Sequence, residues 1–408
     1  MRGLALVASM AMTPRVYLHI GLPKTGTTSI QEMLWHNRSA LAASGVRYPG
    51  HIYDAHQHAA MDLQSHRYRE WWEPLVTGAW QRLVDLIREW PGSSIVSSEL
   101  LATATGEQAA RARHDLSFAD VHVVCTVRDL ARQIPSVWQE SVKNGETIGY
   151  SVFRDALRSE EPSGLSQLFW DYQDIPRILE NWGTGLPADH VHVITVPGQP
   201  GAPGLLWRRF AGVLGLDPDL LPPLPTRNSS LSAGGAELLR RLNTALDENL
   251  GWSRYAAVVK DQVAAEILAG RGGMTLPAQD RAWVRARARR MVAELGERRY
   301  HVLGDLADLL PPLGDGDTPA EPREAAEVSD AAEPSDAEVL DAAVTALAGL
   351  VERVPPLPPD VAGLERVRHR LRELSDAYPA LMTVRRLYWT GKARLRRPGR
   401  NRDWHPLR

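Results

Sequence analysis

The sequence predicts an α/β protein with a parallel sheet flanked by helices. Short β-branched runs alternate with longer stretches of helical periodicity. The chain has 408 residues, of which 44% are hydrophobic, and this is enough for a sizeable core. Strands that alternate with helices pair in parallel, and such sheets bind ligands beyond the carboxyl ends of their strands. Strands are predicted at residues 15–20, 93–98, 121–127 and 190–196, so functional residues are expected at 21–29, 99, 128 and from 197 onward.

Composition narrows the class of protein. The formal net charge is −2 and the pI is near 6.7, so no overall positive charge favours nucleic acid as a partner. The single cysteine, Cys125, lies in the apolar run "VHVVCTV" and is expected in the core; an internal disulfide is excluded, which favours a reducing compartment. The sequence contains no apolar run of about 18 residues or more. A cytoplasmic protein without an integral membrane segment is therefore expected.

The chain is expected to divide into four parts. Residues 1–11 form a disordered leader and residues 12–310 form the main domain. An acidic, Pro- and Ala-rich linker follows at 311–360, because residues 311–341 hold ten Asp or Glu and one Arg. Residues 361–408 are expected to be a helical segment with a basic tail. Two interpretations of that tail stay open: a mobile terminus, and a segment that docks on an anionic surface or on the acidic linker itself.

The loop "GLPKTGTTS" links the first predicted strand to a helix. A nucleotide P-loop reads G-x-x-x-x-G-K-[ST]. Gly21 and Gly26 have that glycine spacing, but Thr27 stands at the lysine position and Lys24 lies two residues before Gly26. Backbone amides at the start of a helix favour an anion, and threonine hydroxyls add donors. The expected fold is therefore a P-loop NTPase-like sheet whose loop carries its cation at a different position.

The run "PKTGTT" resembles the 5'-phosphosulfate loop, P-K-[ST]-G-T-T, of sulfotransferases that use 3'-phosphoadenosine 5'-phosphosulfate (PAPS). The resemblance implies that Lys24, Thr25, Gly26, Thr27 and Thr28 bind the 5' end of this donor. It also implies that the lysine contacts the bridging oxygen of the leaving phosphate. Sulfuryl transfer of this kind needs no metal, and none is expected.

A second match lies in "VVCTVRDLARQIPSVWQESV". Arg128 ends a predicted strand and Ser136 follows eight positions later, as in the R-x7-S pattern of the family's 3'-phosphate site. A guanidinium offers a planar pair of donors to a phosphate. Ser136, next to Pro135, is expected near a helix start. The alternatives are an ion pair between Arg128 and Asp129, and an ordinary helical serine.

The third match is Glu99, which follows the predicted strand "SSIVSS". Several family members place a glutamate there as the base that deprotonates the acceptor, where others have a histidine. The alternative for Glu99 is a carboxylate that stabilises a helix start. The segment "HIYDAHQHAAMD" is expected to be a loop that lines the acceptor pocket rather than a metal site, and its His58 is the second candidate for the base.

These matches imply transfer of a sulfuryl group from PAPS to a hydroxyl or amine of a glycan, a glycolipid or a secondary metabolite. Two features depart from the family: Ser97 replaces a lysine that often accompanies the catalytic residue, and no clear R-K-G nucleotide motif is found. Residues 225–232 or 270–275 are candidates for the adenine contacts. The alternatives are a P-loop kinase, with Asp129 as its metal ligand, and an inactive nucleotide- or glycan-binding relative.

Overall fold

A computed structural model describes residues 13–65, 74–159, 161, 163–197, 204–221, 230–246, 250–311 and 334–353. Within these ranges one sheet has the strand order β2–β3–β1–β4–β5–β6, and all of its neighbouring strands are parallel. The predicted α/β fold class is confirmed. The strands are β1 (Arg15–His19), β2 (Val46–Arg47), β3 (Ser93–Ser97), β4 (Asp120–Val127), β5 (Val191–Thr195) and β6 (His301–Leu303).

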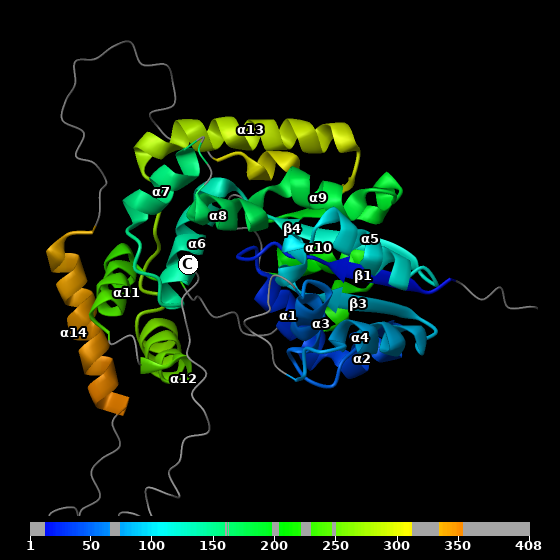
Figure 1. The fold of residues 1–408 in the computed structure, drawn as a ribbon, viewed down its shortest axis with the longest axis horizontal. Helices are drawn as coiled ribbons and strands as arrows, with labels where there is room; N and C mark the ends of the chain where they lie inside the picture. The colour runs from blue at the N-terminus through cyan, green and yellow to red at the C-terminus, as the bar shows by residue number, and fades with distance from the viewer. Residues whose placement is uncertain are drawn as a thin grey trace, which may run out of the picture.

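Helices cover both faces of the sheet (Figure 1). Successive side chains of a strand point to opposite faces, so Val16 and Leu18 belong to one apolar core and Tyr17 to the other. The first core packs against α3 (Ala55–Leu63), α4 (Ala79–Arg88), α5 (Gly106–Asp115) and α9 (Ile175–Gly183). The second packs against α1 (Thr27–His36), α2 (Arg38–Ala43) and α10 (Leu205–Leu214).

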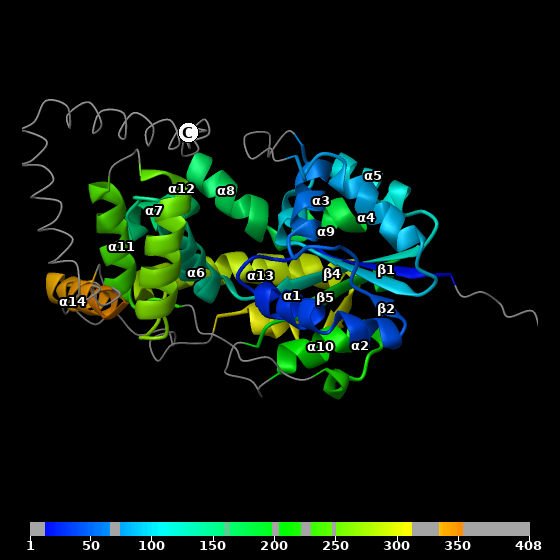
Figure 2. The same cartoon turned by 90° about the horizontal axis from the view of Figure 1, so that it is seen from below.

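Helices α7, α11, α12 and α14 extend the fold beyond one end of the sheet in both views (Figures 1 and 2). None of the helices in the described ranges combines the length and apolar character needed to cross a bilayer. The remaining elements are η2 (Glu99–Thr103), α6 (Leu130–Lys143), α7 (Tyr150–Arg158), α8 (Gly164–Gln173), η3 (Ala188–His190), η4 (Pro218–Leu220), α11 (Ala233–Ala245), α12 (Trp252–Tyr255), the π-helix η6 (Ala256–Ile267), η7 (Ala278–Asp280), α13 (Arg281–Arg298), η8 (Leu306–Leu309) and α14 (Asp336–Arg353).

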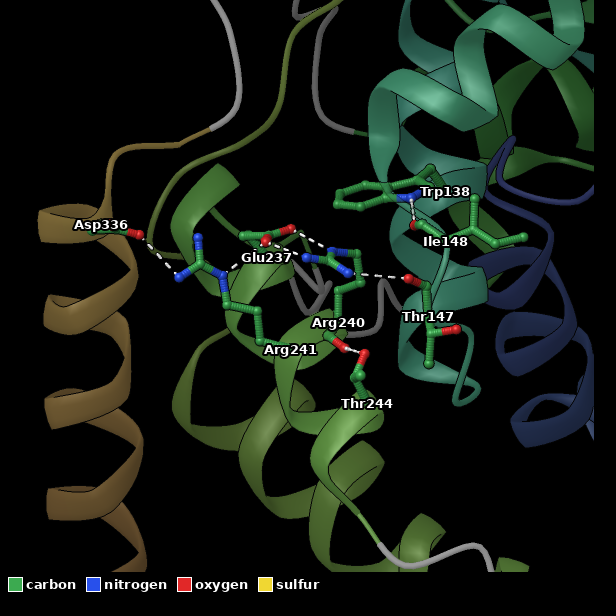
Figure 3. Close-up of polar contacts among 8 residues, drawn as sticks. All are labelled: Trp138, Thr147, Ile148, Glu237, Arg240, Arg241, Thr244 and Asp336. Carbon is green, nitrogen blue, oxygen red and sulfur yellow. Dashed lines mark hydrogen bonds and ion pairs between the residues drawn. The ribbon is translucent and has the colours of Figure 1, made fainter.

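Helix α14 corrects one sequence expectation. It lies inside the segment 311–360 that was predicted to be a linker, and it packs along α11. Figure 3 shows the polar contact at its first turn, where Arg241 of α11 donates to Asp336 (Nη1 to Oδ1, 2.9 Å) and to Glu237. Buried alanines of α14 at 342 and 346 join the first core. The acidic, Pro- and Ala-rich composition predicted a linker, but helical spacing of small apolar residues gives this helix a face that packs.

The predicted strands agree with β1, β3, β4 and β5 to within one or two residues at each end. Strand β6 was not predicted, because its three residues are too few to show an alternating pattern. The structure does not describe residues 1–11 or residues 361–408, which include the basic tail. The expectations for these segments stay predictions.

Candidate anion site and acceptor pocket

The loop after β1 is held against β4 by hydroxyl groups. Thr126 of β4 donates its hydroxyl to the Gly21 carbonyl (2.9 Å), and Thr25 donates its own to the Leu22 carbonyl (2.6 Å). The two hydroxyl oxygens lie 2.6 Å apart, and Thr25 is only 2% exposed. The Thr25 side chain therefore shapes the loop, and only its backbone amide is left to contact a ligand.

The amino end of α1 offers unpaired backbone donors. Gly26 precedes the helix in the left-handed region (φ 94°), no side chain caps the helix, and its first turn contains no acidic residue. Gly26 and Thr28 are exposed, whereas Thr27 is 2% exposed. A Cβ at Gly26 would lie 2.5 Å from Leu206 of α10. The glycine thus permits both the turn and the close packing, and the exposed helix end suits an anion.

Lys24 sits in the left-handed region (φ 66°), which is uncommon for a residue with a side chain. Its ammonium lies 3.0 Å from Oε2 of Glu140 on α6, and Lys260 approaches the other oxygen of that carboxylate at 3.6 Å. Lys143 lies one turn further along α6. Three of the four lysines in the chain therefore gather around one glutamate.

Charge coupling in this cluster is visible in the pKa values. Burial alone would raise the pKa of Glu140, but Lys24 and the other two lysines outweigh it and leave the pKa below its usual range. Burial lowers the pKa of Lys143 to about 8; Glu140 opposes this shift, and the two like charges add to it. The carboxylate is therefore ionised at neutral pH and holds the Lys24 ammonium.

Arg128, directly after β4, contacts the loop. Its Nη1 donates to the Lys24 carbonyl at 3.2 Å, so the two matched motifs meet although they are 104 residues apart in sequence. Its Nε is buried and has no hydrogen-bond partner in the described part of the chain. Burial, and then Arg132, lower the pKa of the guanidinium to about 10, although Asp129 opposes the shift; the group stays charged at neutral pH. Burying a cation with an unpaired N–H donor costs free energy unless an anion accepts a hydrogen bond from that donor.

The alternative ion pair between Arg128 and Asp129 is not formed among the described residues. Asp129 caps α6 by accepting from the Arg132 amide at 3.0 Å, and its carboxylate pairs with the Arg132 side chain. Asp129 is 2% exposed. It therefore offers little to a magnesium ion, which is the role that a kinase would require of it.

Ser136 lies inside α6 and not near its start as expected. It is the seventh residue of a helix that begins at Leu130 and has Pro135 within it. Gln133 donates to the Pro23 carbonyl at 2.9 Å, and Glu140 holds Lys24 from the same helix. Residues three or four apart share a helix face, so Ser136 lies between these two contacts on the side of α6 that faces the loop.

Glu99 borders a pocket beside the start of the loop. Gly21 has a φ of 107°, and a Cβ there would lie 3.2 Å from the Cα and Cβ of Glu99. Gln31 of α1 donates to Oε2 of Glu99 at 2.9 Å. The cap of η2 is provided by Ser98, whose hydroxyl accepts from the Leu100 amide. The pocket has a volume of about 140 Å³ and is lined by Gln31, Tyr48, Tyr53, Asp54, His56, Gln57, Ser97, Ser98, Glu99 and Leu100.

The histidine segment contributes to this pocket through a helix and not through a loop. His56 lines the pocket, but its Nδ1 accepts from the Ser97 amide (3.1 Å) and its Nε2 lies 2.6 Å from the Pro49 carbonyl. Burial lowers the pKa of His56 to about 4, so the ring is neutral. His58 is not among the lining residues, because two positions along α3 turn it to the opposite side of the helix from His56. Of the two candidate bases, Glu99 lines this pocket and His58 is not among its lining residues.

The two candidate adenine segments give little further support. Residues 222–229 lie outside the described part of the chain, and Leu231 exchanges two hydrogen bonds with the Gln139 side chain on α6. Residues 270–275 form the connection between η6 and α13, where the Gly270 amide donates to the Ser230 carbonyl at 2.9 Å. Both assignments stay predictions.

Three polar side chains at the site were not singled out from the sequence: Gln31, Gln133 and Glu140. Two of them flank Ser136 on one face of α6, and helical spacing alone was a signal that could have found them. Gln31 carried no such signal, because its contact with Glu99 joins residues 68 positions apart.

Comparisons with known proteins add a fold-level likeness. No protein-family model matches the chain, and no curated protein matches it. Among solved structures, the chain is similar to the crystal structure of a sulfotransferase from Alicyclobacillus acidocaldarius. The two share 16% identity over 60% of this chain and 94% of the other, with a TM-score of 0.36. At that score the likeness carries no argument about activity, which we derive from the residues of the site.

Proposed function

We propose that the protein is a sulfotransferase that moves a sulfuryl group from PAPS to a hydroxyl or amine of a glycan, a glycolipid or a secondary metabolite. The contact of Arg128 with the Lys24 carbonyl carries this proposal, because it joins the loop and the arginine that resemble the two ends of the family's donor site. The open helix end and the unused Nε of Arg128 fit an anionic ligand.

The residues divide into three roles. Amides of the loop and of the first turn of α1 receive the 5' end of the donor, with Lys24 next to the leaving phosphate. Arg128, with Ser136 on the adjoining face of α6, receives the 3'-phosphate. Glu99, at the pocket, accepts the acceptor's proton while the acceptor oxygen or nitrogen forms a bond to sulfur and the sulfur to phosphate-oxygen bond breaks. PAPS supplies the sulfuryl group and leaves as adenosine 3',5'-bisphosphate.

A thermal-shift comparison tests this assignment. Adenosine 3',5'-bisphosphate without metal is expected to raise Tm, since a ligand that binds only the native state stabilises it by mass action. Arg128→Ala should weaken that binding, and Lys24→Ala should mainly lower the rate of sulfate transfer. Arg111→Ala, which removes a side chain that is 62% exposed on α5, is the matched control.

The outcomes separate the alternatives. Stabilisation by ATP with magnesium, and not by the bisphosphate, would favour the kinase. Bisphosphate binding with no sulfate transfer to any acceptor, and no effect of Glu99→Gln, would favour the inactive relative. Unchanged bisphosphate affinity in folded Arg128→Ala would exclude the proposed 3'-phosphate site.

A further inference from the structure

Four histidines and an aspartate gather at the amino ends of β4, β5 and β6. Asp120 and His122 lie on β4, His190 ends η3 just before β5, and His192 and His301 pair across β5 and β6. The proposed donor site is at the opposite end of β4, about 25 Å away for eight residues of extended chain. The cluster is thus separate from the proposed chemistry.

Three of these side chains present donor atoms close together. Oδ2 of Asp120 lies 3.2 Å from Nε2 of His122, and Oδ1 lies 3.3 Å from Nδ1 of His190. All three groups have one ligand atom within 4.8 Å of the others. Ligand atoms bound at about 2.0–2.1 Å to a tetrahedral zinc ion are about 3.3 Å apart. The two nitrogen–oxygen distances have this length but end at different oxygens of Asp120, so a shift of the side chains is needed to bring all three ligand atoms around one ion.

A chain of histidine contacts orients the His122 ring. Its Nδ1 lies 2.9 Å from Nε2 of His192, whose Nδ1 lies 2.9 Å from Nδ1 of His301. Neutral imidazoles carry one proton each, so the chain runs in one direction or the other. In one direction His122 Nε2 carries a proton that it donates to Asp120. In the other direction, His122 Nδ1 donates to His192 and His122 Nε2 carries no proton. The lone pairs of His122 Nε2 and Asp120 Oδ2 then face each other across 3.2 Å unless a cation binds both atoms.

We propose that Asp120, His122 and His190 bind a divalent transition metal of the zinc class, with His192 and His301 as the hydrogen-bonded support of the His122 ligand. Two imidazole nitrogens with one carboxylate favour zinc and its neighbours over magnesium or calcium, which prefer oxygen ligands. A ligating histidine usually donates its other ring N–H to a fixed acceptor, as His122 can donate to His192. Water supplies the remaining coordination position.

The surroundings allow such an ion to reach the site. The side chains of Asp120 and His190 are 31% and 24% exposed, and that of His122 is 11% exposed. Arg15 lies 3.6 Å from Asp120 but is 50% exposed, so it can turn into solvent when a cation binds. The rings of His122 and His190 stack at 19° and must rotate about their soft terminal torsions to share one ion. His190 Nδ1 is also 3.3 Å from the Val121 carbonyl.

Bound metal would connect the start of β4 to the segment that enters β5, and through the histidine chain to β6. Strand β6 has three residues and lies at the edge of the sheet. The ion would therefore stabilise the edge of the sheet and leave the loop after β1 unaffected.

The test uses the full chain, treated with a chelator and then titrated with Zn²⁺ by calorimetry, with metal analysis after dialysis. One zinc ion per chain is expected, and Co²⁺ should give the visible bands of a tetrahedral site. His190→Ala, at a partly exposed position, should abolish stoichiometric binding. His192→Ala, which removes the hydrogen-bond partner of the His122 ring, should weaken binding about 10- to 100-fold, as loss of a supporting hydrogen bond does at metal sites. His114→Ala, on the exposed end of α5, is the control.

The proposal would be overturned if the parent chain bound no stoichiometric zinc, or if folded His190→Ala bound zinc with the parent's stoichiometry and Kd. Loss of binding in His114→Ala to the same degree would likewise assign the zinc elsewhere. Circular dichroism of each variant shows whether it is folded, and none of these outcomes depends on sulfotransferase activity.

Discussion

Replacing Glu140 with glutamine should destabilise the free protein and tighten its binding of adenosine 3',5'-bisphosphate. The carboxylate pairs with Lys24 at 3.0 Å and with Lys260 at 3.6 Å, and all three side chains are 25–33% exposed. Partly exposed ion pairs contribute about 0.5–1 kcal/mol each, so the substitution should lower the free energy of unfolding by about 1–2 kcal/mol. At about 2–4 °C per kcal/mol, the expected fall in Tm is a few degrees.

The effect on binding has the opposite sign. In the proposed function Lys24 contacts the leaving phosphate and must first leave Glu140, so removing this ion pair makes the free energy of binding about 1 kcal/mol more favourable. This corresponds to roughly fivefold tighter binding of the bisphosphate. Isothermal titration measures it directly, and urea unfolding measures the stability. Glu146→Gln is the matched control: it removes a carboxylate three residues beyond α6 whose pKa is raised by burial alone.

The stabilising effect of Glu140 should depend on pH. Because the pKa of Glu140 is lowered in the folded state, its stabilising contribution is present above the ordinary glutamate range and is lost as the pH falls through the lowered pKa. The stability difference between the parent and Glu140→Gln should therefore shrink at acid pH.

Bisphosphate binding that is weaker than, or equal to, that of the parent in a folded Glu140→Gln protein would refute the idea that this glutamate competes for Lys24.

Three further predictions concern stability and the loop. Lys143 is 6% exposed, and its pKa of about 8 lies below the ordinary 10.5. Between these two pH values the unfolded state binds more protons than the folded state, so the free energy of unfolding should rise with pH. In urea unfolding, Lys143→Met should lack this rise, and at neutral pH its free energy of unfolding should exceed that of the parent by on the order of 2 kcal/mol. Gly26→Ala forces an alanine into the left-handed backbone region and places its Cβ 2.5 Å from Leu206 of α10. Titration should therefore show much weaker bisphosphate binding, and Tm should fall. An affinity equal to that of the parent would contradict the packing argument. Arg154→Met leaves Asp280, which is fully buried, with Arg158 as its cation and the Trp283 indole as a neutral donor. Denaturation should show a loss of about 3 kcal/mol, whereas a loss under about 1 kcal/mol would mean that these two partners suffice.

The predictable part of the fold depends on local pattern. The strands β1, β3, β4 and β5 are β-branched runs that show their character without knowledge of their partners. The loop and Arg128 were found for a related reason, since an anion site needs particular residues at fixed spacing after a strand. The contact between Arg128 and Lys24 follows from the parallel sheet, because the carboxyl ends of adjacent strands β1 and β4 lie at one edge.

The sequence by itself determined the α/β class and singled out the loop after β1 and the other residues that resemble a donor site, because each depends on residues close together in the chain. Only the tertiary structure decided that Lys24 is held by a glutamate 116 residues away and that His56, not His58, lines the pocket beside Glu99. It also decided that histidines of β4, β5 and β6 meet at the amino ends of these strands. These features arise from strand order and helix rotation. Both are set by how the whole core packs, which no local pattern specifies.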